Sequence, residues 1–250
     1  MFFAKRALIL AALIGFLATP SVADEIVSLK GGYHKLEASG DVGVGGDVVD
    51  IEDDLGIDDD DGFFAEAALQ LGAFRLFTSY QPISFSGSTV LTRDIDFNGE
   101  TFVEGSSIDS DLDIDIYEGG LAWFLINLDD QPVRIQFGPE VAVKYIDTKV
   151  EVRDRALGLQ ESESVGVPIP SLGARARIAF ADYLGVVGRV GYLSYDGNSL
   201  TDIDVQVEYS PIPLVGIYAG YRYLDMDIDE DDLLLDAEFS GPHAGALIRF

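Results

Sequence analysis

The sequence predicts an all-β fold, a membrane-spanning antiparallel up-and-down β-barrel of about ten strands. Apolar and polar residues alternate with a period of two along most of the chain, as they do when the two faces of a sheet meet different surroundings. Along the chain, the connections between these segments alternate between tight turns and longer loops. No segment after the amino terminus reaches the roughly 18 to 20 consecutive apolar residues of a spanning helix. In lipid, only a closed barrel would then satisfy the backbone hydrogen bonds.

The amino terminus has the pattern of a secretory signal peptide over Met1–Ala23. Lys5 and Arg6 form a short basic region, an apolar run follows, and small residues end the segment. We therefore expect the mature chain to begin near Asp24 and residues 24–250 to form a single barrel domain.

The composition excludes several classes of function. The formal net charge is −28, from 44 acidic and 16 basic residues, and phosphate-mediated nucleic-acid binding requires Lys and Arg instead. Cysteine is absent, which removes disulfides and thiol chemistry. We expect no cofactor. Acidic residues cluster in Asp50–Asp61 and Asp225–Asp232, and such blocks are usually solvated, with weak attraction for divalent cations as the alternative.

The period-two alternation divides the mature chain into ten segments separated by Gly, Asn, Asp and Pro turns. An eight-stranded barrel, with one weak pair merged, stays open as an alternative. The ten segments are Ile26–Ser39, Gly62–Leu71, Ala73–Val90, Ser110–Ile126, Pro132–Lys149, Val165–Phe180, Tyr183–Tyr195, Leu200–Tyr209, Leu214–Ile228 and Leu233–Phe250.

The connections indicate how the strands are oriented. Tight turns follow every second strand, whereas three of the other connections are long and polar, at Gly40–Asp61, Leu91–Asp109 and Val150–Ser164. Short periplasmic turns and longer outer loops are typical of bacterial barrels with both ends in the periplasm. Asn98-Gly99 is a hairpin signal that favours a β-ribbon continuing the third and fourth strands above the membrane.

The apolar face of each strand is assigned to lipid and the charged face to the lumen. In the fourth segment, Leu112 and Leu121 have opposite parity, which predicts a β-bulge near Gly119-Gly120. Aromatic residues near strand ends predict interfacial girdles; they are Trp123, Phe124, Phe180, Tyr183, Tyr192, Tyr195, Tyr209, Tyr221 and Tyr223.

With this facing, the lumen collects a charged network and two histidines. The network is either a salt-bridged filling or a basic constriction that favours anionic or zwitterionic solutes. His34 and His243 lie on the first and last segments, which pair in a closed barrel, and they form either a pH-sensitive or weakly metal-binding pair or two unrelated lumen histidines. The predicted network comprises Lys30, Glu66, Arg75, Glu118, Arg134, Glu140, Lys144, Arg175, Arg177, Arg189, Glu208 and Arg222.

Two further patterns bear on activity. Neither histidine has Ser within two positions or Asp beside it, which disfavours a lipid-modifying or protease-type barrel enzyme. Four acids, Asp109, Asp111, Asp113 and Asp115, share one strand face. They form either a solvated edge or a weak site for divalent cations that bridge to lipopolysaccharide phosphates.

The last segment alternates apolar and polar residues up to a terminal aromatic, Phe250. Together with the signal peptide and the short inner turns, this resembles the Gram-negative outer-membrane β-barrel superfamily of porin-like and small OmpA- or OmpW-like proteins. The resemblance implies location in the outer membrane, contact with lipid and lipopolysaccharide, and insertion by the barrel assembly machinery, with Phe250 as its signal. The expected function is a non-enzymatic structural barrel or small-solute pore; the alternatives are a barrel enzyme or a surface adhesion or ligand-binding barrel that uses its acidic loops.

Overall fold

The computed structural model describes residues 26–44, 48–51, 59–97, 100–128, 133–154, 159–195, 198–212, 214–230 and 233–250. The signal-peptide segment and the Asn98-Gly99 turn lie outside the described residues. The strands in chain order are β1 (Val27–Val44), β2 (Val48–Asp50), β3 (Asp59–Leu71), β4 (Phe74–Val90), β5 (Ile95–Phe97), β6 (Glu100–Phe102), β7 (Ser107–Trp123), β8 (Ile126–Leu128), β9 (Arg134–Asp154), β10 (Leu159–Ala181), β11 (Leu184–Tyr195), β12 (Asn198–Ile212), β13 (Val215–Glu230) and β14 (Leu233–Arg249). Within these residues, no helix is long and apolar enough to cross a membrane.

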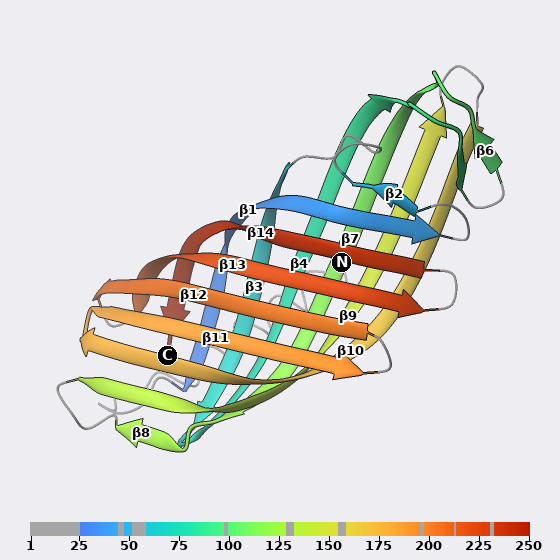
Figure 1. Ribbon diagram of the computed structural model, residues 1–250. Helices are drawn as coiled ribbons and strands as arrows, with labels where there is room; N and C mark the ends of the chain where they lie inside the picture. Colours follow the sequence, from blue (N-terminus) through green and yellow to red (C-terminus); the bar gives the residue numbers. More distant parts are fainter. Residues whose placement is uncertain are drawn as a thin grey trace, which may run out of the picture.

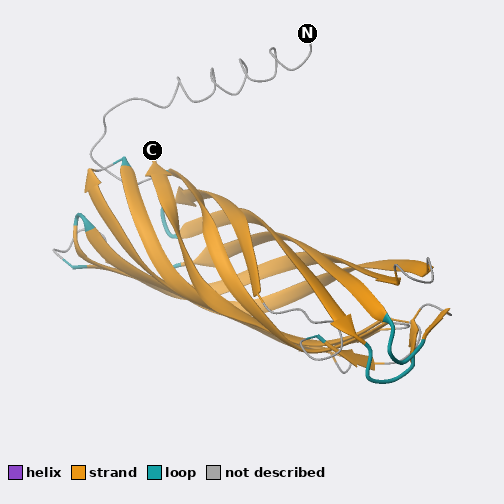
Figure 2. Ribbon diagram, turned by 90° about the horizontal axis from the view of Figure 1, so that it is seen from above, coloured by secondary structure: helices purple, strands orange, loops and turns teal. Residues whose placement is uncertain are grey.

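Ten long strands form a closed antiparallel barrel (Figure 1). The order around the wall is β10, β11, β12, β13, β14, β1, β3, β4, β7 and β9, and the β9–β10 pairing closes the ring. The ten-strand prediction is confirmed, and the eight-strand alternative is wrong. Figure 2 shows the carboxy terminus at one end of the barrel, where the Phe250 N–H donates to the Val27 carbonyl at 2.8 Å. We call this end basal and the opposite end distal.

The polarity of the two faces reverses halfway along the barrel, while the same parity points inward from one end of each strand to the other. On β9, the basal residues Val141 and Tyr145 are exposed on the outer surface, whereas the distal residues Ile146 and Val150, of the other parity, are buried in the interior. The assignment of apolar residues to the outside therefore holds in the basal half and is wrong in the distal half. A wall in lipid needs an apolar exterior, while a wall in water needs an apolar core.

This reversal also explains why the predicted bulge on β7 is wrong. The β4–β7 register runs without a shift from Phe74↔Trp123 to Val90↔Ser107. Leu112 is buried inside the distal half, and Leu121 is exposed outside the basal half. Their opposite parity therefore reflects a change of surroundings, and the backbone stays regular.

Four strands, β4, β7, β9 and β10, rise beyond the closed part of the barrel (Figure 1). The predicted loop Val150–Ser164 is wrong over most of its length, because β9 extends to Asp154 and β10 starts at Leu159, with continuous pairing between them. The alternation continues through Val150 and Val152, whose side chains are buried. The residues between them are hydrophilic because they form the outer face of a strand in water. In the sequence, such a stretch resembles a polar loop.

Prolines mark the levels at which the extension separates from its neighbours. The β3–β4 pairing ends at Ala65↔Tyr80, just before Pro82, and the β10–β11 pairing ends at Leu172↔Tyr192, just beyond Pro170. Proline has no N–H to donate to a ladder, so in sheets it is confined to edges. Above these levels, the described pairs of β4 and β10 are with β7 and β9 alone.

The expected hairpin around Asn98-Gly99 is present as the pairing of β5 with β6. It forms a separate two-stranded sheet, so its prediction as a continuation of the third and fourth strands is wrong. Ile95 and Phe102 of this hairpin are buried in the distal interior. Two short strands, β2 and β8, occupy stretches predicted as connections or strand ends; they pair with β1 and β9.

Candidate functional site: the filled interior of the barrel

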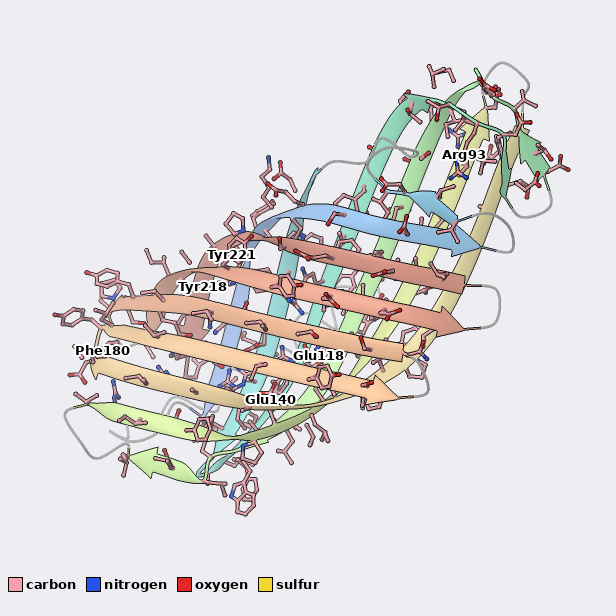
Figure 3. All side chains as sticks on the ribbon, viewed as in Figure 1. Arg93, Glu118, Glu140, Phe180, Tyr218 and Tyr221 are labelled. Carbon is pink, nitrogen blue, oxygen red and sulfur yellow. The ribbon has the colours of Figure 1, made fainter. Side chains whose placement is uncertain are left out.

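The basal interior is filled by a charged network whose members come from several strands. In the basal half, even-numbered residues of β7, β9 and β12 and odd-numbered residues of β10 and β11 point inward, because strand side chains alternate. Figure 3 labels Glu118 and Glu140 of this network, both buried, and Phe180 and Tyr221, both exposed on the outer surface. Strand parity and closure together place the charges in one compartment.

Lys144 lies at the centre of the network, and its side chain is 0% exposed. Its ammonium contacts Glu118 at 2.6 Å and Asp202 at 2.8 Å. The Arg189 guanidinium bridges Glu118 and Glu140, with its Nε 2.6 Å from Glu140. Each buried charge thus has a partner of opposite sign, as burial requires.

The centre is extended by two more arginines. Arg175 Nε donates to Glu140 at 2.5 Å, and Arg222 contacts Asp202 at 3.1 Å. Arg175 and Arg189 also lie over the ring of Phe77, with 4.7 and 5.1 Å between the guanidinium carbon and the ring centroid, a favourable cation–π geometry. The cluster therefore ties β7, β9, β10, β11, β12 and β13 together across the interior.

The two histidines face each other across the seam between β1 and β14. His34 is the register partner of His243, and both are buried. His243 Nε2 lies 2.8 Å from Asp204, and His34 Nδ1 lies 3.3 Å from the Gln81 amide nitrogen. Within the described residues, no group of three or more His, Cys, Asp or Glu side chains is arranged to hold a metal ion. The two histidines lie on the basal side of the hydrophobic cluster that fills the distal half of the barrel.

The distal interior is a hydrophobic core, which we call the distal core. Its rings and aliphatic chains are almost fully buried, and Phe85 stacks on Phe239 with 5.8 Å between centroids. Side chains from both walls of the distal half meet in it; members include Val42, Ile51, Ile83, Leu112, Leu200, Leu224, Met226 and Phe239. A wet path through the barrel would have to cross this apolar packing, so the described interior is closed at that level.

The comparisons with known proteins concern the fold. No family model matches the chain, and no curated protein matches it. Among solved structures, Ail, the attachment invasion locus protein of Yersinia pestis, is 12% identical, with 90% of this chain and 99% of that chain covered and a TM-score of 0.42. Neisserial surface protein A is 11% identical, with 92% and 100% covered and a TM-score of 0.38. The translocator domain of the autotransporter NalP from Neisseria meningitidis is 10% identical, with 100% and 96% covered and a TM-score of 0.48.

All three are outer-membrane β-barrels. All three TM-scores are below 0.5, so the fold of this chain rests on its own strand order and closure. At these identities the similarity concerns architecture alone, so the chemistry of the site must come from the residues of this chain.

The structure places the twelve predicted network residues on the inner side of the basal wall, with Arg134 at the rim, where it contacts Asp182 at 3.5 Å. Sequence reasoning missed four members: Asp202, Asp204, Arg249 and Gln81. Asp202 shares strand and parity with Gln206 and Glu208, and Arg249 lies on the polar face of the last strand, so parity alone would have found both. Gln81, which accepts a hydrogen bond from Arg222, gave no comparable signal.

Aromatic side chains form two belts on the outer surface of the basal half. The distal belt contains Tyr80, Tyr117 and Tyr145, which are consecutive register partners on β4, β7 and β9. The basal belt contains Phe74 stacked on Trp123, with 6.1 Å between centroids. Most predicted girdle residues described here are exposed in these belts, but the assignment of Phe124 is wrong, because its side chain is buried.

The acidic ladder Asp109, Asp111, Asp113 and Asp115 points outward on the distal half of β7. Its register partners on β9 alternate in charge: Arg153 faces Asp109, and Glu151 faces Asp111. A hydrogen bond from Lys149 holds the pKa of Glu151 below its ordinary value. Acidic and basic side chains therefore alternate on this outer face, as suits a wall in water.

Proposed function

We propose that this protein is a non-enzymatic, non-conducting outer-membrane barrel that supports the envelope and holds a four-stranded extension above the lipid. The observation that carries this proposal is the sealed interior, with salt bridges in the basal half and the distal core above them. A buried charge network within an eight- or ten-stranded barrel leaves little free cross-section. Of the structural and pore functions that the sequence allows, the geometry supports the structural one.

The proposal extends to location and partners. The belts bound an apolar surface such as Ile135–Tyr145 on β9, close to the roughly 9 to 11 residues that a tilted strand needs to span a bilayer. We place the basal end in the periplasm and the extension outside, in contact with lipopolysaccharide. Phe250, at the basal end, would be the residue that the barrel assembly machinery reads.

The non-enzymatic part of the proposal rests on the surroundings of the histidines. Their polar neighbours include Gln81 and Asp204, and aromatic rings of Phe64 and Tyr218 pack around them. Both are buried beneath the distal core, remote from either mouth. A substrate would have no route to a general base in this position.

We expect the purified protein to give no steady conductance steps in planar lipid bilayers. Arg175→Ala and Arg177→Ala should be equally silent, because both residues lie below the distal core, which would still seal the path. A porin reconstituted in the same bilayer serves as the positive control. Reproducible unitary steps from the unmodified protein, altered in ion preference by Arg175→Ala, would establish a pore instead.

A second candidate function, surface binding, is favoured by the free edge of β10. Residues 160–170 pair with β9 on one side, and the β10–β11 pairing begins only at Leu172. Pro168 and Pro170 have no N–H, so the even-numbered positions are those that face away from β9. Ser162, Ser164 and Gly166 then direct their N–H and C=O groups to the open edge, where an extended strand can add.

The charge of the extension indicates the kind of strand that would fit. Glu161 and Glu163 lie on this segment, and Asp147 and Glu151 lie on the neighbouring strand. A second copy of the same edge would bring acids together, which is unfavourable across a strand pair. A basic extended segment is therefore the partner that this edge favours.

We expect a fluorescently labelled peptide of alternating Lys and Thr to bind the folded protein, and Ser164→Pro to weaken this binding about tenfold, since one strand-addition hydrogen bond and its continuation are lost. Ser164→Ala keeps the N–H and should bind like the unmodified protein. Fluorescence anisotropy measures the affinity. Equal binding by the Pro and Ala variants would remove this edge as the binding surface.

A further inference from the structure

The basal mouth of the barrel concentrates positive charge in a strongly acidic protein. Glu208 is contacted there by three cations: Lys30 at 2.9 Å, Arg177 at 3.6 Å and Arg249. Gln206 also donates to it at 3.2 Å. One carboxylate thus serves as the common partner of three basic side chains.

A fourth cation, Arg134, lies at the same mouth, where it contacts Asp182 at 3.5 Å. The Asp182 side chain is fully exposed, so water screens its charge. The nearby pair of Glu66 and Arg75, 3.0 Å apart, is neutral as a whole. Among the described residues, the mouth therefore brings Lys30, Arg134, Arg177 and Arg249 together around Glu208 and the exposed Asp182.

The basic groups surround an open hollow. Arg134, Arg177, Arg249, Glu208, Ser210 and Tyr183 are among the residues that line a space of about 190 Å³ that includes open solvent. The side chains of Arg177 and Arg134 are 28% and 35% exposed, so both guanidinium groups are accessible from the basal side. Arg249 donates to the Ser210 hydroxyl at 3.0 Å, which fixes its position on the wall.

We propose that this mouth is an anion-binding site that takes a phosphate group presented from the periplasmic side. Guanidinium groups bind phosphate through paired, charge-assisted hydrogen bonds. A phosphate bound here would accept hydrogen bonds from the exposed guanidinium groups of Arg134 and Arg177, in addition to the contacts that these groups make with Asp182 and Glu208. The inference is independent of whether the barrel conducts, because the site lies below the charged network and is open to the basal solvent.

The phosphate can belong to a soluble ion or to a phospholipid headgroup, and the experiment separates the two. Folded protein in a zwitterionic detergent is titrated with inorganic phosphate by isothermal titration calorimetry. The same protein is placed in nanodiscs of phosphatidylcholine with and without phosphatidylglycerol, and bound lipid is measured by native mass spectrometry. Saturable binding of either probe supports the site and names its source.

Arg177→Gln and Arg134→Gln are each expected to weaken binding about tenfold, since each removes one charge-assisted contact. Arg134 is at the exposed rim, so its variant should fold even if Arg177→Gln does not. Arg153→Gln, which removes an exposed arginine on the distal half, is the matched control and should leave binding unchanged. Binding of neither probe, or an equal loss in the Arg153 variant, would overturn the proposal.

Discussion

Leu112→Asp is expected to unfold the distal half of the barrel. Leu112 is 0% exposed in the distal core. Replacing it removes an aliphatic side chain, at a cost of about 2–5 kcal/mol. It also buries a carboxylate, whose pKa can shift by about 3–5 units, a further cost of roughly 1.4 kcal/mol for each unit. The total is comparable with the stability of a whole domain, about 5–15 kcal/mol.

The neighbouring residue Asp113 provides the matched control, because it has the opposite parity on the same strand and is exposed. Asp113→Leu should change the stability by no more than about 0.5 kcal/mol. The single tryptophan, Trp123, lies in the basal belt, so its fluorescence reports the lipid-embedded half. Limited proteolysis reports the distal half. We expect Leu112→Asp to be cleaved rapidly while its Trp123 emission stays unchanged. Equal protease resistance of the two variants would contradict a distal hydrophobic core.

The sequence predicts strand number, order and basal facing well, because these follow from local alternation. Segments such as Pro132–Lys149 and Leu214–Ile228 are close to the observed β9 and β13. The pairing of the first and last strands, on which His34 and His243 lie, also follows from closing the ring, whereas their exact register is seen only in the structure. Inward parity then places the charged residues in one compartment without knowledge of any contact.

The sequence could not reveal the level at which the surroundings of the barrel wall change from lipid to water. Period-two alternation is the same for a wall in lipid and a wall in water. Under the assumption that the whole barrel lies in lipid, the opposite parity of Leu112 and Leu121 could be explained only by a bulge. The distal stretch around Val150 was hydrophilic enough to resemble a loop. The position of Gln81 within the network depends on its contact with Arg222, on a strand far away in the sequence, and no local pattern encodes this contact.

Removing a basic side chain from the basal network is expected to cost less stability than removing an acidic one. Among the described residues of the basal interior, basic groups outnumber acidic groups, and four of the six carboxylates each contact more than one cation. The basic members are Lys30, Arg75, Lys144, Arg175, Arg177, Arg189, Arg222 and Arg249, and the acidic members are Glu66, Glu118, Glu140, Asp202, Asp204 and Glu208.

Glu118→Gln should therefore destabilise the barrel by about 3–5 kcal/mol, the usual cost of breaking a buried ion pair from one side. Lys144 and Arg189 would both lose their contact with this carboxylate. Lys144→Met removes a cation of similar length, and it leaves Glu118 paired with Arg189 and Asp202 paired with Arg222. Its cost should be smaller by more than about 1 kcal/mol, the net contribution of one hydrogen bond.

The protein in phosphatidylcholine vesicles is unfolded with guanidinium chloride and followed by Trp123 fluorescence. Linear extrapolation gives the free energy of unfolding of each variant. The double variant Glu118→Gln/Lys144→Met should cost less than the sum of the single variants by about 0.5–3 kcal/mol, because the two side chains are in contact at 2.6 Å. A larger cost for Lys144→Met than for Glu118→Gln would mean that the interior is short of positive charge.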